Sequence, residues 1–155
     1  MTKQEEYDTV IAQIKAVLDG EPNTTARMAT VSCLLAEAFP ERFYWTGFYV
    51  VDAVCENELV VGPYQGTLGC LRIKFGKGVC GTAAATRQTQ VVADVHAIEN
   101  HIACDSRTSS EIVVPVVDAV GKLIAVLDVD STVVDAFDHI DQVNLESLMV
   151  SVFAG

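Results

Sequence analysis

The chain has 155 residues, a length that fits one domain and leaves no room for two domains of ordinary size. Half of the residues are hydrophobic and 20% are charged, which is close to the average of globular proteins and argues against disorder. Acidic residues outnumber basic ones by 21 to 10, so the net charge is −11. Such a surface repels phosphate backbones and anionic lipids. We therefore expect a single domain over residues 1–155 that binds neither nucleic acid nor membranes.

The N-terminus and the cysteines indicate a cytoplasmic protein. No window approaches the roughly 20 uncharged apolar residues that cross a bilayer, and the polar start Met1-Thr-Lys-Gln-Glu-Glu is unlike a secretory leader. The cytoplasm keeps thiols reduced, and five cysteines (33, 55, 70, 80 and 104) are an odd count for a disulfide framework. Because the sequence holds no CxxC or HxxxH pair, it predicts no structural metal site.

Two helices are expected in the first forty residues. Apolar residues recur every three or four positions from Tyr7 to Leu18, which is typical of one face of a helix. A second stripe of this kind runs from Met28 to Phe39. Asn23 or Thr24 is suited to cap the second helix, because either side chain can accept a hydrogen bond from a free backbone N–H of its first turn.

Aromatic and β-branched segments then predict strands. We expect them at 43–51, 58–64, 70–75, 90–93, 111–117 and 122–130. A short helical piece is expected at 82–86, and a last helix at 137–153 with Asp135 or Thr132 as its cap. Helices at both ends of about six strands predict an α+β fold, in which N- and C-terminal helices pack on one face of an antiparallel sheet.

A glycine-rich segment, Gly76-Lys-Gly-Val-Cys-Gly81, matches the pattern G-x-G-x-x-G. A dinucleotide site needs a longer helix after this pattern, so we reject that interpretation. The glycines instead predict a turn from a strand into a helix whose first turn holds Cys80. The positive end of that helix would favour a thiolate at Cys80; the alternative is a small apolar residue that fills space.

A polar segment, residues 94–110, is long for a simple turn, and loops of this length are often functional. It contains Cys104 between His101 and Arg107, a setting that predicts an exposed and partly ionised thiol. The alternatives are an incidental loop cysteine and an ordinary surface histidine.

Three acidic residues form a further candidate site. Asp128 and Asp130 lie two positions apart on one strand and therefore share a face. If Glu111 at the start of the preceding strand comes near them, repulsion among three carboxylates would raise at least one pKa. The alternative is that this end of the sheet opens into water. Trp45 is most simply a core residue.

Six segments, taken together, resemble the free methionine-(R)-sulfoxide reductases, which are enzymes of a single GAF domain. They are Trp45–Tyr49, Glu58–Gly66, Gly76–Thr82, His101–Ser106, Ser110–Pro115 and Leu127–Ser131. The most specific feature of this resemblance is the cysteine spacing: Cys80 lies 10 residues after Cys70, and Cys104 lies 24 residues after Cys80. The resemblance therefore implies a GAF-like sheet.

The resemblance also implies roles for the cysteines. Cys104 would attack the sulfoxide sulfur, Cys70 would be the resolving partner, and Cys80 would be an alternate or relay thiol. Cys33 and Cys55 lie outside the pattern and receive no role.

The same resemblance implies a substrate pocket. Glu111, Asp128 and Asp130 match the family's acidic pocket residues, and Trp45 matches an aromatic residue at the substrate site. The chain departs from the family where Phe-Pro-Gly often precedes the cysteine loop, because it has Ile98-Glu-Asn100 there. This departure concerns the shape of the pocket loop.

The implied reaction reduces free L-methionine (R)-S-oxide without a cofactor or metal. A carboxylic acid with a raised pKa would protonate the sulfoxide oxygen, and the attacking cysteine would become a sulfenic acid. A second thiol would then form an intramolecular disulfide, which a thioredoxin-type reductant would reopen. The alternatives are a GAF module that senses redox state or binds a small ligand without turnover, and a degenerate structural homologue. The sequence is compatible both with a monomer and with a homodimer that pairs through the terminal helices.

Overall fold

The computed structural model describes residues 1–102 and 104–155 and contains four α-helices among them. The α-helices are α1 (Lys3–Leu18), α2 (Thr24–Ala38), α3 (Gly78–Thr86) and α4 (His139–Met149). A single 3₁₀ turn, η1 (Val95–Ala97), precedes the cysteine loop, and a π-helical turn, η2 (Val150–Ala154), follows α4. None of the described helices has the length and apolar character needed to cross a membrane.

The strands form one six-stranded antiparallel sheet in the order β3-β2-β1-β6-β5-β4. They are β1 (Trp45–Val51), β2 (Glu58–Gln65), β3 (Arg72–Lys74), β4 (Gln90–Val92), β5 (Ser110–Val117) and β6 (Leu123–Ser131). The α+β fold expected from the sequence is therefore confirmed. The expected strand 70–75 is shorter in the structure, so Cys70 lies in the loop between β2 and β3.

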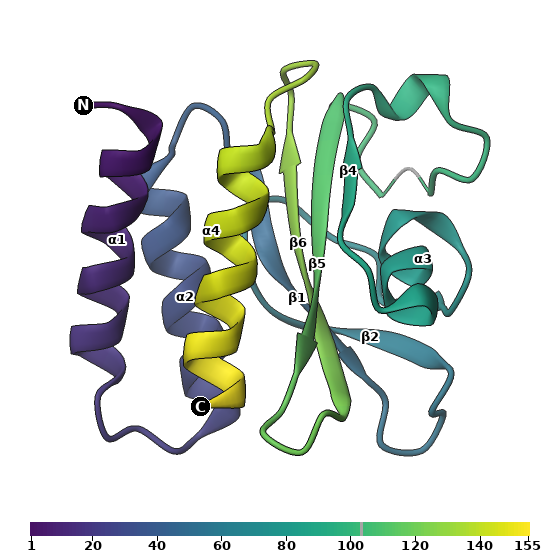
Figure 1. Ribbon diagram of the computed structural model, residues 1–155. Coiled ribbons are helices and arrows are strands. Elements are labelled where there is room, and N and C mark those ends of the chain that lie inside the picture. Colours follow the sequence, from purple (N-terminus) through teal and green to yellow (C-terminus); the bar gives the residue numbers. More distant parts are fainter. Residues whose placement is uncertain (103) are drawn as a thin grey trace.

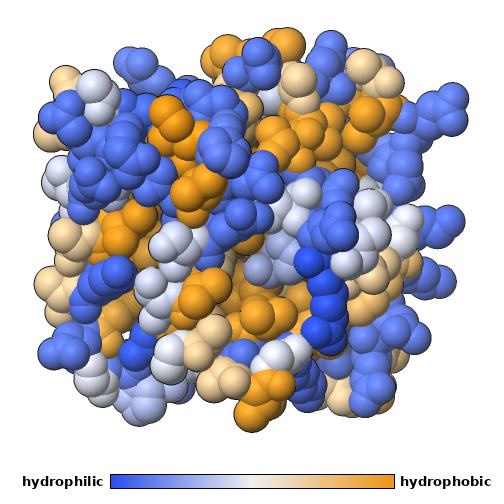
Figure 2. All heavy atoms as spheres, in the orientation of Figure 1, coloured by the Kyte–Doolittle hydropathy of each residue, from blue (hydrophilic) through white to orange (hydrophobic). Residues whose placement is uncertain are grey.

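The terminal helices cover one face of the sheet, as expected. Figure 1 shows α2 and α4 between α1 and the sheet, while α3 and the loops around it lie on the opposite face. Side chains from the inner helices and from β1, β5 and β6 fill the core between these layers. On the face of the molecule shown in Figure 2, small hydrophobic patches are separated by hydrophilic residues.

Two helix starts differ from the sequence-based expectation. The helix expected at 82–86 begins already at Gly78, whose φ of +63° suits glycine, so the predicted turn from a strand into a helix with Cys80 in its first turn is confirmed. The cap of the last helix is Asp138 rather than Asp135 or Thr132, because the Asp138 side chain accepts hydrogen bonds from two backbone N–H groups of the first turn. The expected cap at Asn23 is confirmed.

Strand alternation separates the two faces of the sheet. On β6, Ala125, Leu127 and Val129 face the core beneath the helices. Val126 faces the opposite side, where a second apolar cluster joins the sheet to α3. Residues of β6 at even positions from 126 onward therefore point toward α3 and the cysteine loop.

A buried ion-pair network fastens the N-terminus to α4. The side chain of Asp141 is fully buried and accepts hydrogen bonds from Lys3 Nζ at 2.9 Å, Arg42 Nη1 at 3.1 Å and the Tyr7 hydroxyl. The three donors lie in α1 and just before β1. Because removing one partner leaves buried charges without compensation, this carboxylate is a structural anchor.

We expect Asp141→Asn to lower the free energy of unfolding by about 3 kcal/mol, because Lys3 and Arg42 lose their shared counter-charge. Urea denaturation measures this change. Glu41→Gln, an exposed acidic neighbour of Arg42, is the matched control and should change the stability by less than about 0.5 kcal/mol. Equal effects of the two substitutions would contradict the anchoring role.

Candidate active site

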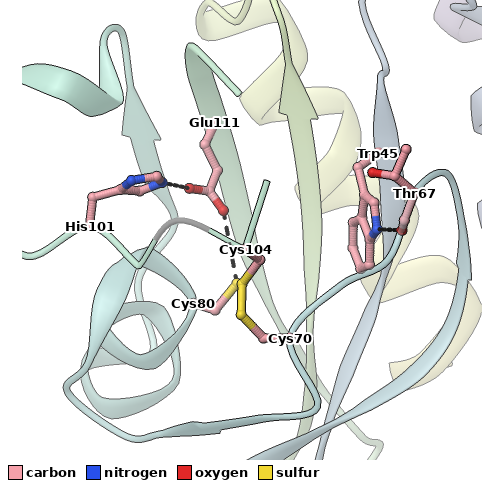
Figure 3. Close-up of a disulfide and its surroundings, with 7 residues drawn as sticks. All are labelled: Trp45, Thr67, Cys70, Cys80, His101, Cys104 and Glu111. Carbon is pink, nitrogen blue, oxygen red and sulfur yellow. Dashed lines mark hydrogen bonds and ion pairs between the residues drawn. A yellow bond between two sulfur atoms is a disulfide. The ribbon is translucent and has the colours of Figure 1, made fainter. Parts of the chain in front are cut away.

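A disulfide joins Cys70 and Cys104, the two outer members of the spaced cysteine set (Figure 3). Cys70 lies in the β2–β3 loop and Cys104 in the loop between η1 and β5, and their Cα atoms are 5.3 Å apart. Cys33, Cys55 and Cys80 are free. The bond connects two loops 34 residues apart in the sequence, and residue 104 is exposed.

A cavity lies between this disulfide and the sheet. It is narrow, with an accessible volume of about 30 Å³, so while the disulfide is formed it has room for no more than a small group. Cys104, Asp105 and Leu68 line it from the loops, and Gly78 to Cys80 line it from the start of α3. The sheet contributes six further lining residues, Trp45, Tyr49, Ile73, Glu111, Asp128 and Asp130.

The three predicted acidic residues meet in this cavity because of the strand register. Asp130 on β6 pairs with Glu111 on β5 and with Trp45 on β1, so these three residues form one row across the sheet. Asp128 lies two positions back on β6 and points the same way. Glu111 and Asp128 are only 6% and 4% exposed. The alternative that this end of the sheet opens into water is therefore wrong.

Burial and mutual repulsion change the chemistry of these acids. Burial raises the pKa of Glu111, Asp128 and Asp130 well above the ordinary carboxyl value, and the negative charge of a neighbouring acid raises each one further. One buried oxygen, Asp128 Oδ1, has no hydrogen-bond partner among the described residues. Both effects favour the protonated form of the acids, and Asp128 Oδ1 presents a free acceptor to a ligand.

Cys80 lies against the same acids, and the expectation that its thiol is ionised is wrong. Its sulfur is 4.0 Å from Glu111 Oε2 and lies within 4.8 Å of a carboxyl oxygen of Asp128. Burial raises the pKa of the Cys80 thiol, and the negative charges of Asp128 and Glu111 raise it further. These effects exceed the opposite influence of the positive helix end, because the residue is buried and the helix is short.

His101 is also part of the site and is not the surface residue considered above. Its Nε2 atom lies 3.8 Å from Glu111 Oε1, and its side chain is only 15% exposed (Figure 3). Burial lowers the pKa of His101, while burial raises that of Glu111, so both shifts favour a contact between neutral groups over an ion pair.

Asp105 ties the loop of Cys104 to the loop of Cys70, and sequence reasoning missed it. Its carboxylate accepts hydrogen bonds from the Thr67 hydroxyl at 2.7 Å, from the Tyr44 hydroxyl at 2.9 Å and from Arg107. The bonds from Arg107, with those from Thr67 and Tyr44, hold the pKa of Asp105 far below its usual value, so the clamp stays ionised. In the sequence near Asp105, only Arg107, two residues later, could have indicated that the acid has a partner.

The cysteine loop is held by hydrogen bonds at Ile98-Glu-Asn100, where the sequence departs from the family pattern. Asn100 Oδ1 accepts a hydrogen bond from the N–H of Gly78, and its Nδ2 donates to the carbonyl of Gly76 and to the Thr82 hydroxyl. Asn100 therefore fastens the cysteine loop to the first turn of α3.

Trp45 belongs to the cavity wall as well as to the core. Its ring stacks between Tyr49 and Tyr64, with centroids 5.4 and 4.8 Å away. Its Nε1–H donates to the carbonyl of Thr67 at 2.8 Å (Figure 3). The indole thus supports the β2–β3 loop through this hydrogen bond, and Trp45 also lines the cavity.

Comparison with known proteins places this geometry in a family. Residues 33–152 match the GAF domain family. Free methionine-R-sulfoxide reductase of Saccharomyces cerevisiae is 42% identical over 151 residues, which cover 96% of this chain and 84% of the yeast protein. The protein of that name from Escherichia coli is 41% identical over 152 residues, covering 98% and 89% of the two chains.

Solved structures agree. The X-ray structure of free methionine-R-sulfoxide reductase from Neisseria meningitidis, in complex with its substrate, superposes with a TM-score of 0.90. It is 44% identical, and the match covers 96% of this chain and 87% of that one. The chain belongs to the free methionine-R-sulfoxide reductase family of GAF domains.

Because its acids are buried, this site should lower the free energy of unfolding of the protein. The folded-state pKa of Asp128 lies above its unfolded value of about 3.9, so the folded protein binds the proton more tightly and loses stability as the pH rises between those values. An asparagine side chain at this position has no carboxyl proton to lose. We expect Asp128→Asn to be more stable than the parent at pH 7 by about 1 kcal/mol.

Urea denaturation between pH 3 and pH 8 measures the difference. It should be small below about pH 4, where both side chains are neutral, and grow with pH. Asp19→Asn, at an exposed position, is the control and should show no such growth. A gain in stability that does not change with pH would contradict the role of the buried charge.

Proposed function

We propose that the protein reduces free methionine (R)-sulfoxide to methionine. The observation that carries the proposal is a disulfide beside a small cavity that also holds two buried carboxyl groups, Glu111 and Asp128, and a third that is half-buried, Asp130. Sulfoxide reduction by thiols needs both parts, a sulfur pair that can be oxidised and an acid that can protonate a poor leaving oxygen. The names of the relatives support the same substrate.

In the proposed reaction Cys104 attacks the sulfoxide sulfur as a thiolate. A carboxylic acid of the cluster gives its proton to the oxygen, which passes to the cysteine as sulfenic acid while methionine leaves. The thiol of Cys70 then attacks the sulfenic sulfur, water departs, and the disulfide forms. The two electrons that reduce the sulfoxide come from the two thiols, so the chemistry requires no cofactor.

The acidic cluster also offers a reason for a free amino acid as the substrate. The α-ammonium group of free methionine sulfoxide can pair with one ionised carboxylate, while a second acid keeps its proton. Asp128 Oδ1, buried and without a partner among the described residues, is a suitable acceptor. Lys77 lines the cavity mouth and can attract the substrate carboxylate. A sulfoxide within a protein chain lacks both charges.

A thioredoxin-type dithiol would reopen the disulfide and complete the cycle in the cytoplasm, where such reductants keep thiols reduced. A GAF redox sensor is the competing function, because the same cysteines could be oxidised once without turnover. The two functions differ in stoichiometry. An enzyme consumes reductant in proportion to the substrate supplied, whereas a sensor consumes one equivalent per chain.

We expect Cys104→Ser to lose at least about 10³-fold in turnover, because serine is a far weaker nucleophile toward sulfur. NADPH oxidation coupled through thioredoxin reductase and thioredoxin, with free methionine sulfoxide, measures the rate. Cys33→Ser, a free cysteine outside the cavity, is the matched control and should keep full activity.

Cys70→Ser separates the two candidate resolving thiols. Without added small thiols this variant should release about one methionine per chain and then stop, since the sulfenic acid finds no partner. Continued turnover of Cys70→Ser would assign resolution to Cys80. Full activity of Cys104→Ser would end the proposal, and a single equivalent of NADPH consumed by the parent would favour the sensor.

The acidic pocket makes a second prediction, about substrate form. N-acetylation of methionine sulfoxide removes the ammonium charge, so kcat/KM should fall by about 10- to 100-fold, which corresponds to the loss of one charged hydrogen bond. The methyl ester of the free sulfoxide keeps the ammonium and loses only the carboxylate that Lys77 would attract, so it measures that second contact separately. Equal kcat/KM values for the free and the N-acetylated sulfoxide would remove the acids from substrate selection.

A further inference from the structure

Exposed apolar side chains flank the disulfide. Leu68 and Leu71 are 78% and 71% exposed and lie on either side of Gly69 and Cys70, and Ile102, 40% exposed, lies two residues before Cys104. We name these three side chains the apolar rim. Leu68 and Ile102 line the cavity mouth beside Cys104, whereas Leu71 does not line the cavity. A role in holding the substrate therefore does not account for Leu71.

The outward direction of the rim is built into the loop. A Cβ atom added at Gly69 would lie 2.9 Å from both the Trp45 ring and the Tyr49 hydroxyl, so the backbone of this loop lies directly on the aromatic wall. The side chains of Leu68 and Leu71, on either side of Gly69 and Cys70, remain largely exposed to solvent. The Asp105 clamp holds the loop carrying Ile102 against this one.

We propose that the apolar rim is the docking surface for a dithiol protein reductant of the thioredoxin type. The inference rests on the proposed catalytic cycle, which needs an external dithiol in every turn. A small thiol needs access only to a sulfur atom, whereas a protein must exclude water around the exchanging sulfurs, and apolar side chains around a reactive centre provide that contact. The disulfide lies within the rim, as such a partner requires.

Docking places one thiolate of the partner against the disulfide. That thiolate attacks one of the two sulfurs, the bond between Cys70 and Cys104 breaks, and a mixed disulfide forms between the proteins. The partner's second thiolate then displaces the enzyme sulfur. The partner ends as a disulfide, and Cys70 and Cys104 have received two electrons and two protons.

The test compares a protein reductant with a small one. Leu71→Gln keeps the approximate size of the side chain and removes its apolar character, without altering any residue that lines the cavity. We expect kcat/KM for thioredoxin to fall about tenfold, as for truncation of an important interface residue. Turnover supported by dithiothreitol should be unchanged. Val120→Gln, 87% exposed in the β5–β6 turn, is the matched control and should leave both rates unchanged.

Three other results would overturn the inference in distinguishable ways. If Leu71→Gln and Val120→Gln have the same kcat/KM for thioredoxin, the rim does not dock the reductant. If Leu71→Gln loses the same factor with dithiothreitol, the side chain acts on the disulfide itself. If the parent protein shows no turnover with either reductant, the proposed function fails and the docking inference fails with it.

Discussion

The site depends on one electrostatic constraint, the gathering of three carboxyl groups, two buried and one half-buried, at one end of the sheet. Glu111 and Asp130 are cross-strand partners, and Asp128 shares their face, so the strand register prevents the acids from separating. In this environment burial raises the pKa of all three acids, and their mutual repulsion raises it further. Burial likewise raises the pKa of the Cys80 thiol, and the negative charges of Asp128 and Glu111 raise it further. The cluster is therefore suited to donate a proton.

The fold can tolerate such a site because the sheet has two different faces. The face beneath α2 and α4 carries an apolar core that extends from Tyr7 in α1 to Val152 in η2. The face toward α3 is apolar only in part, and its acidic end lies beneath the cysteine loops. Stability is supplied on one face and chemistry on the other, which is the usual division when function requires locally unfavourable groups.

Sequence patterns anticipated what depends on local spacing. The period of two in β6 placed Asp128 and Asp130 on one face, and the order of helices and strands gave the α+β class. The patterns did not show the Asp105 contacts, because its partners Thr67 and Tyr44 are 38 and 61 residues away in the chain. The charge state of Cys80 was mistaken for a similar reason. Its helix position is local information, whereas its raised pKa comes first from burial in the folded protein and then from acids on β5 and β6.

The placement of the sulfurs and the acids on different kinds of structure has a chemical consequence. The acids lie on strands in the middle of the sheet, where hydrogen bonds on both sides hold the backbone. The two sulfurs lie on loops, whose joining bond must form and break in each proposed cycle. The Asp105 clamp links these loops independently of the disulfide, since it joins Thr67 and Tyr44 through a carboxylate that stays ionised. Reduction of the disulfide then frees the thiols while the clamp keeps both loops, and the apolar rim on them, close to the acids.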